Sequence, residues 1–258
     1  MNIILDIETI PAQRPDVMEE IRTIKQVELD AALASIAPPG NYKKQETIDE
    51  WTANEAPKIA AKLRSACEDH VDEAYRRTGL DGAYGQVCVV GMAQADGFPV
   101  KIYESDWQDP QAERRILESL SAQLTEWGKP SDVFTTCIIG HNVAGFDLRF
   151  LAQRHIVNHI KPHIVIGRAA QAKPWEGDKV FDTMVQWTGS ASVRISLDKL
   201  CKALSIPTPK DGGITGATVW DAVQEGRIAD VAAYCAGDVL ATREAWRRMT
   251  YQDQRMAA

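Results

Sequence analysis

The chain opens with NIILDIETIP (residues 2–11), an apolar run that ends in two carboxylates and a proline. This composition predicts a buried strand that ends at Pro11, because proline cannot donate to a strand ladder. Alternate side chains of a strand share a face, so Asp6 and Glu8 would lie on one face, about 6.6 Å apart along the strand. Like charges that close raise each other's pKa unless a cation lies between them. The pair therefore needs a compensating charge nearby.

Length and composition limit the classes of protein that this chain can belong to. Its 258 residues can form one domain, or one domain with a large insertion, and 45% hydrophobic and 25% charged residues are typical of a globular protein. No apolar run approaches the roughly 18 residues of a membrane span, and the start lacks the basic region of a signal peptide. Five widely spaced cysteines without a CxxC pair favour buried thiols in a reducing compartment. We expect a cytoplasmic protein without a membrane partner.

Further elements follow from apolar periodicity and from glycine and proline breaks. The pattern predicts helical pieces over about 13–80 with a break at 37–44, a hairpin of strands 85–93 and 98–105, a helix over 111–127, a strand at 133–142, a helix over about 146–159, a strand at 179–185, a helix over 196–204 capped by Ser196 and a final helix over 226–249. This order predicts a mixed α/β sheet with the first strand central and helices on its flanks. Sheets of this kind bind ligands at the carboxyl ends of their strands, and DIE (residues 6–8) lies at such an end.

Two other acidic positions follow in the chain. GHNVAGFD (residues 140–147) comes directly after a predicted strand, and Asp147 begins the next helix, where an aspartate is most often a cap. In the final helix, Tyr234 and Asp238 are four residues apart and therefore neighbours on one face. Taken alone, the pair is equally well explained as two hydrogen-bonded side chains beside the buried apolar face of this helix.

Together, the order DxE, HNxxxFD and YxxxD resembles the DEDD exonucleases, in the subgroup with tyrosine in the third motif. Within that group, DIETIP, GHNVAGFDLRFLAQR and YCAGDVLAT resemble the predicted 3′–5′ exonucleases related to the proofreading domain of family B DNA polymerases. The resemblance extends over nearly the whole chain. It implies a ribonuclease H-like fold in which residues 1–258 form a single exonuclease domain, with a helical insertion at about 13–80.

The resemblance also implies the catalytic residues, which are Asp6, Glu8, Asp147, Tyr234 and Asp238. The four acids would hold two divalent cations, Mg²⁺ or Mn²⁺, which activate a water and stabilise the leaving oxygen in phosphodiester hydrolysis. By analogy, Asp6 bridges both ions, Glu8 and Asp238 hold the ion on the nucleophile side, and Asp147 holds the other. Tyr234 would orient the attacking water, because a hydroxyl of pKa about 10 is a poor unassisted base.

Contacts to the nucleic acid are expected from a few other residues. The backbone of Ile7 and the side chain of Thr9 would contact the terminal 3′ nucleotide, and Asn142 and Phe146 would line its pocket. The segment from 148 to 180 has six basic and two acidic residues, a net charge of +4 in a chain of −7. It is explained either as a phosphate-binding track or as a solvated surface. If the segment binds phosphates, the contacts are expected from Arg149, Arg154 and Lys173.

Three functions are compatible with these motifs. The first is a metal-dependent 3′–5′ exonuclease that releases nucleoside 5′-monophosphates from DNA, at single-stranded or frayed 3′ ends. The second keeps the chemistry and acts on RNA, because no motif here reports on the 2′ hydroxyl. The third is an inactive nucleic-acid-binding scaffold, which four intact acids disfavour. The helical insertion could gate the substrate or bind a replication or repair protein, and the sequence leaves both open.

Other signals in the chain carry less weight. His155, His159 and His163 recur every four residues, but a proline precedes the last, which argues against one helical zinc site and favours surface histidines. Asp182 is expected to support the site from a strand end. DGGITG (211–216) lacks the lysine of a phosphate-binding loop and is expected to be a loop near the substrate. Trp175 is the tryptophan to test for base stacking.

Overall fold

The computed structural model describes residues 1–173, 176–190, 192–208 and 213–252. In this part of the chain, one five-stranded sheet has the order β3-β2-β1-β4-β5. Its strands are β1 (Asn2–Ile10), β2 (Gln86–Gln94), β3 (Val100–Tyr103), β4 (Cys137–Gly140) and β5 (Val180–Asp182). β1 pairs antiparallel with β2 and parallel with β4, while β3 and β5 extend the sheet on either side. The predicted mixed sheet with a central first strand is confirmed.

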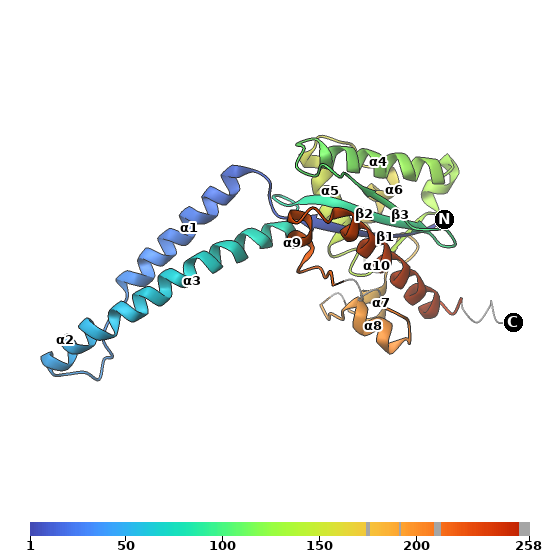
Figure 1. Ribbon diagram of the computed structural model, residues 1–258. Coiled ribbons are helices and arrows are strands. Elements are labelled where there is room, and N and C mark those ends of the chain that lie inside the picture. The colour runs from blue at the N-terminus through green and yellow to red at the C-terminus, as the bar shows by residue number, and fades with distance from the viewer. Residues whose placement is uncertain (174–175, 191, 209–212, 253–258) are drawn as a thin grey trace.

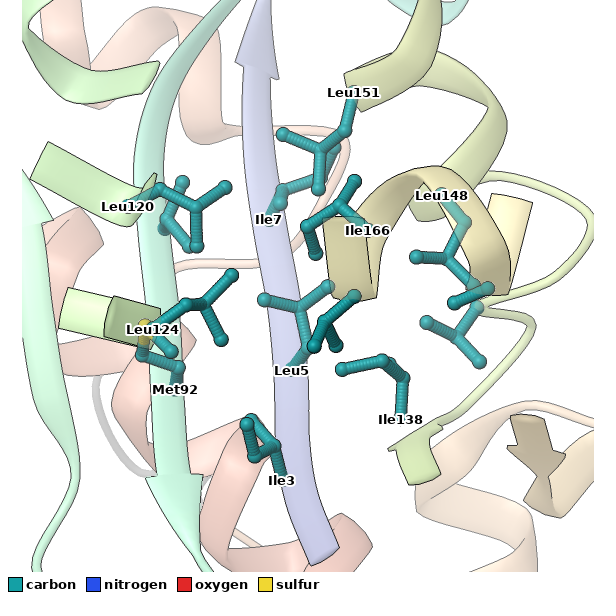
Figure 2. Packing of buried hydrophobic residues seen from close by; sticks show 14 of the residues in the cluster. Ile3, Leu5, Ile7, Met92, Leu120, Leu124, Ile138, Leu148, Leu151 and Ile166 are labelled. Atoms are coloured by element: carbon teal, nitrogen blue, oxygen red, sulfur yellow. The ribbon is translucent and has the colours of Figure 1, made fainter. Parts of the chain in front are cut away.

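One face of the sheet packs on α4 (Ala112–Trp127), α5 (Asp147–Val157) and α6 (Ile164–Ala170). Three odd-numbered residues of β1, Ile3, Leu5 and Ile7, point into this layer (Figure 2). Their partners there include Leu120 and Leu124 of α4, Leu148 and Leu151 of α5, and Ile166 of α6, all buried. The alternation of β1 therefore sends its even-numbered side chains, including both acids, to the opposite face.

The opposite face is covered by α10 (Ile228–Met249), which crosses β1 and β2 (Figure 1). Ile4 of β1 packs there on Val239 and Trp246 of the helix. Gly91 of β2 lies beside Asp6 in the ladder, and a Cβ at this position would come 2.7 Å from the Cys235 sulfur. Because such a contact is too short, glycine at this position permits α10 to approach the acidic half of β1.

The segment between β1 and β2 forms an arm that projects from the body of the molecule (Figure 1). The arm consists of α1 (Pro15–Ala34), α2 (Gln45–Asn54) and α3 (Ala56–Arg77), and a 3₁₀ turn (Thr78–Leu80) joins it to the body. At 1.5 Å per residue, α3 alone is about 33 Å long. Val17 and Val71 are the buried residues of the arm helices, so the arm adds little to the core. The predicted helical pieces and their break are confirmed.

Several element boundaries differ from the prediction. The strand expected at 133–142 is only Cys137–Gly140, since Pro130–Phe134 forms a 3₁₀ turn. The strand expected at 179–185 ends at Asp182, whose carboxylate caps α7 (Thr183–Thr188) by accepting the N–H groups of Met184 and Val185. The pattern also did not predict α6 or α9 (Val219–Gln224). α8 (Leu197–Ala203) has the predicted cap, in which the Ser196 hydroxyl oxygen accepts from a backbone N–H.

In the part of the chain that the structure describes, no helix combines the length and apolar character that crossing a bilayer requires.

Candidate active site

The acidic half of β1 extends past the end of its neighbour β4. β4 pairs only with residues 2–4 of β1, so the β4-side edge of the strand is open from about Asp6 onward. The N–H of Ile7 donates across this gap to Oδ1 of Asp147, at 3.0 Å. Asp147 is the first residue of α5 and only 3% exposed. A short β4 thus lets the start of α5 place a carboxylate against β1.

Helix α10 brings the third motif to the same place. Cys235 is fully buried, and its sulfur lies 3.3 Å from Oδ2 of Asp6. Tyr234 and Asp238, one turn apart on α10, share a side-chain hydrogen bond. Ligand atoms of Asp6, Glu8 and Cys235 all lie within 4.8 Å of one another. Segments near residues 6, 147 and 235 therefore meet at one point between β1, α5 and α10.

The acids of this cluster act strongly on one another. Burial raises the pKa of Asp6 well above its usual range, and the charges of Asp147, Glu8 and Asp238 raise it further. Burial, then Asp238 and Asp147, raises the pKa of Glu8 in the same way. Burial also raises the pKa of Asp147 to about 7, although backbone N–H groups, including that of Ile7, lower it in part. The four predicted metal ligands form one electrostatic cluster.

The donor set of this cluster fits divalent cations. Burial and neighbouring carboxylates raise the pKa of Asp6 and of Glu8, and the group that partly offsets this for Asp6 is the Cys235 thiol, which is not a cation. Carboxylate oxygens are the ligands that Mg²⁺ and Mn²⁺ prefer. Burial raises the pKa of the Cys235 thiol well above its usual range, so in the metal-free protein its S–H is a neutral donor to Asp6. The four acids are the residues that would hold the ions.

A pH-dependent stability follows for the metal-free protein. The pKa values of Asp6, Glu8 and Asp147 are raised above the value of about 4 expected in the unfolded chain. Above about pH 4, the folded protein thus retains protons that the unfolded chain has lost, and stability falls as pH rises through this window toward 7 and beyond. We expect a higher melting temperature at pH 5 than at pH 8 in EDTA, measured by differential scanning calorimetry. Adding Mn²⁺ at pH 8 should raise it again.

Other groups also titrate in this range, so the control is a variant of the cluster itself. Asp147→Asn retains an oxygen that can accept the Ile7 N–H but removes one titrating charge. Its fall in melting temperature from pH 5 to pH 8 should be smaller than that of the wild-type protein. Equal pH dependence in the two proteins would contradict a strained acidic cluster.

A cleft of about 540 Å³, here called the β1 cleft, adjoins the acids. Ile7, Thr9 and Phe146, three of the four residues predicted to contact substrate, line it together with Glu8. The N–H of Ile7 is already donated to Asp147, and the Thr9 hydroxyl donates to the carbonyl of Gly79 at 2.6 Å. A bound nucleotide would therefore meet the remaining surface of these residues, including the acceptor lone pairs of Thr9.

Asn142 lies apart from the other residues predicted to contact substrate. It lines a separate cavity of about 200 Å³ with Asp182, and its backbone has a left-handed φ of 61°. The carboxylate of Asp182 accepts the N–H groups of Asn142 and Ala144 at 2.9 and 3.1 Å. These bonds hold the loop that leads to Asp147. Asn142 and Phe146 therefore line separate cavities, and their contacts with a nucleotide stay a prediction. Asp182 lies at the end of its strand, as expected, and its supporting role also stays a prediction.

The basic segment from 148 to 180 is not the continuous track that its charge indicated. Arg154 is buried and paired with Glu113 at 2.7 Å, so it cannot reach a phosphate. Lys179 pairs with Glu176, and Arg168 donates to the backbone carbonyl of Val133. Three exposed basic residues in the described part of the segment form no ion pair, namely Arg149, Lys161 and Lys173.

The remaining signals in this segment also differ from the expectation. His155 is fully buried, with Nδ1 at 2.7 Å from the Leu151 carbonyl, so it is not a surface histidine. Helix α5 ends at Val157, well before Pro162, which separates His163 from the other two histidines. Trp175 lies outside the described residues, as do residues 211 and 212 of DGGITG.

The comparison with known families identifies the class of this site. Residues 85–258 match the family described as predicted 3′–5′ exonuclease related to the exonuclease domain of PolB. The chain belongs to this family. The matched stretch contains Asp147, Tyr234 and Asp238, whereas the first motif and the arm lie before it. No curated protein matches the chain. Membership in an exonuclease family indicates a nuclease, whose substrate is nucleic acid.

Sequence reasoning missed the position of Cys235 in this exonuclease site. The sequence analysis expected the five cysteines to be buried thiols, and Cys235 does pack in the core. It also contacts Asp6, because residues 235 and 238 are neighbours on the helix surface and Gly91 leaves room for the sulfur. The signal was available in the sequence, since Cys235 directly follows Tyr234 and precedes Asp238 by three residues.

Proposed function

We propose that this chain is a metal-dependent 3′–5′ exonuclease that hydrolyses DNA to nucleoside 5′-monophosphates. The observation that carries the proposal is the convergence of four acids from β1, α5 and α10. Two divalent ions, Mg²⁺ or Mn²⁺, held by Asp6, Glu8, Asp147 and Asp238, would neutralise this cluster. Membership in a predicted 3′–5′ exonuclease family supports it.

We further propose that the fold is ribonuclease H-like and that the chain is one exonuclease domain. A central β1, antiparallel to β2 and parallel to β4, with helices on both faces, supports this. The arm leaves the sheet after β1 and returns to it at β2, which supports its description as a helical insertion at about 13–80.

In this proposal, the bound ions would activate the attacking water and stabilise the leaving oxygen. The chain's own residues prepare the site for them. The Cys235 S–H orients the Asp6 carboxylate, and the Ile7 N–H orients that of Asp147. Burial, then the charges of Asp238 and Glu8, raises the pKa of Tyr234 far above its usual range. Tyr234 therefore stays protonated and acts by hydrogen bonding to a water.

The direct test is digestion of end-labelled nucleic acids. Single-stranded DNA, duplex DNA and RNA are incubated side by side with Mg²⁺ or Mn²⁺, and products are resolved by length. A 5′-labelled DNA strand should shorten one nucleotide at a time from its 3′ end, with release of nucleoside 5′-monophosphates. If RNA is digested faster than DNA, RNA is the substrate in place of DNA. Absence of hydrolysis on all three with either ion would overturn the proposed function.

Replacing Tyr234 by phenylalanine is expected to slow hydrolysis without loss of metal binding. The hydroxyl would orient one water and is not a ligand, and orienting or proton-transferring groups contribute about 10²–10⁴-fold to rate. We expect turnover to fall within or below that range, while Mn²⁺ affinity by isothermal titration calorimetry stays near the wild-type value. Asp238→Ala, one turn further along α10, is the comparison and should lose metal affinity. An equal loss in both variants would contradict the separate roles.

A further inference from the structure

The β1 cleft has two walls of different origin. One wall comes from the sheet and the start of α5, with Ile7, Thr9 and Phe146. The other comes largely from the arm base, defined here as residues 69–80, at the end of α3 and in the following 3₁₀ turn. The family match begins at residue 85, so this wall belongs to the part of the chain outside it. The arm therefore contributes directly to the cavity beside the acids.

The arm base is held against the body by hydrogen bonds to β1 and the residues after it. Besides the bond from Thr9 to Gly79, the Thr78 hydroxyl oxygen accepts the N–H of Ala12 at 2.9 Å. The Tyr75 hydroxyl donates to the Ala12 carbonyl, also at 2.9 Å. These bonds fix the position of the 3₁₀ turn relative to the acidic strand.

A second set of contacts joins the arm base to α9. Arg76 pairs with Asp221 of α9 at 2.8 Å. The ring of Tyr75 packs edge-on against Trp220, with ring centres 6.3 Å apart. Trp220 itself lines the cleft. Bonds to two separate elements make the arm base a defined wall, in contrast to the outer part of the arm, which projects away from the body (Figure 1).

The chemistry of the cleft next to the acids is mostly apolar. Leu80 of the arm base lines it with 62% of its surface exposed, and Phe146 and Ile7 line it from the other wall. Most of the surface of this leucine is therefore free to contact a molecule that enters the cleft. Further along α3, the lining carries charges of both signs, and its two arginines are paired with its acids, Arg76 with Asp72 and Arg77 with Glu73. The apolar side chains that line the cleft thus suit an uncharged flat group, and Glu8 lines the same cleft.

We propose that the arm base is one wall of the nucleotide site, with Leu80 and Phe146 as apolar surfaces for the terminal 3′ nucleobase. The proposal rests on the proposed function, because it places the scissile phosphate at the acids and the base next to Glu8. A cleft of about 540 Å³ is of the size that small ligands occupy. Apolar contact to the face of a base is tolerant of sequence, so all four nucleotides should be accepted.

The experiment compares Leu80→Ala with Val27→Ala in the full chain. Val27 is a matched control, since it lies on α1 of the arm, is 64% exposed and does not line the cleft. Two quantities are measured: the dissociation constant of thymidine 5′-monophosphate in Mn²⁺, by calorimetry, and KM for single-stranded DNA. We expect Leu80→Ala to raise both by about five- to tenfold, at the lower end of the range for losing one base contact, while Val27→Ala changes neither. Leu80→Phe should restore both.

The outcomes separate the two proposals. An active enzyme in which Leu80→Ala and Val27→Ala have equal KM and equal nucleotide affinity would overturn the role of the arm base and leave the proposed function standing. A wild-type protein that hydrolyses none of the three nucleic acids would overturn the proposed function itself. Melting temperatures of the variants should equal that of the wild-type protein, because both side chains are exposed.

Discussion

Replacing Asp6 by alanine is expected to abolish hydrolysis while the protein remains folded. Asp6 lies at the centre of the acidic cluster, and its pKa is raised by Asp147, Glu8 and Asp238 together. Removing a residue that hydrogen-bonds to a metal ligand typically costs about 10–100-fold in activity or metal affinity. Removing a ligand that bridges two ions should cost more. The measurement is the rate at which 5′-labelled single-stranded DNA shortens by release of nucleotides from its 3′ end. Excess metal should not restore this rate in the variant.

Folding of the Asp6→Ala variant is tested in the same preparation. Without metal, its melting temperature should equal or exceed that of the wild-type protein, because one of several repelling carboxylates is gone. Asp96→Ala, at the exposed turn between β2 and β3, is the control and should retain full activity, since its side chain is 94% exposed. Near wild-type hydrolysis by Asp6→Ala would show that the metal-site assignment is wrong.

The largest expected loss of stability comes from replacing Glu113, which lies outside the acidic cluster. Glu113 of α4 is 5% exposed and accepts hydrogen bonds from three groups, the N–H of Val87, the guanidinium of Arg154 and the amide of Asn158. Glu113→Ala leaves the Arg154 guanidinium buried without its carboxylate. Breaking such a pair from one side costs about 3–5 kcal/mol. We expect this loss in the free energy of unfolding, measured by urea denaturation.

Glu118→Ala is the matched control on the same helix. Glu118 pairs with Arg114, but both side chains are about half exposed, so its loss should cost about 0–1 kcal/mol. Replacing Glu113 and Arg154 together by methionine should recover much of the stability, because no buried charge then remains. Equal midpoints for Glu113→Ala and Glu118→Ala would show that the buried pair does not stabilise the fold.

The short-range hydrophobic pattern of the sequence was sufficient to predict the central part of the fold. The apolar run of β1 ending in DIE predicted a central strand with both acids on one face, and the structure has Ile3, Leu5 and Ile7 on the other. The helical pieces of the arm and the final helix also followed from periodicity. These features are determined locally, because strand alternation and helix period depend only on neighbours in the chain.

Motif order in the sequence also predicted that the acids of β1, α5 and α10 converge. The geometry of that convergence depended on contacts that no local pattern encodes. Asp147 reaches β1 because β4 is short and the Ile7 N–H is left for it. Cys235 reaches Asp6 because Gly91 of another strand leaves room for its sulfur. Both depend on atoms that are distant in sequence.

Charge and exposure were decided by the tertiary structure alone. Arg154 counted as one charge of a basic track, yet Glu113, 41 residues away, buries and pairs it. Asn142 followed its strand as expected, but its backbone N–H is held by Asp182 of a different strand, and it lines a cavity separate from the β1 cleft. The sequence by itself determined the central strand, the helices of the arm, the final helix and the chain order of the four acids. Which side chains face the substrate was decided by long-range contacts, since exposure depends on what the rest of the chain packs against each residue.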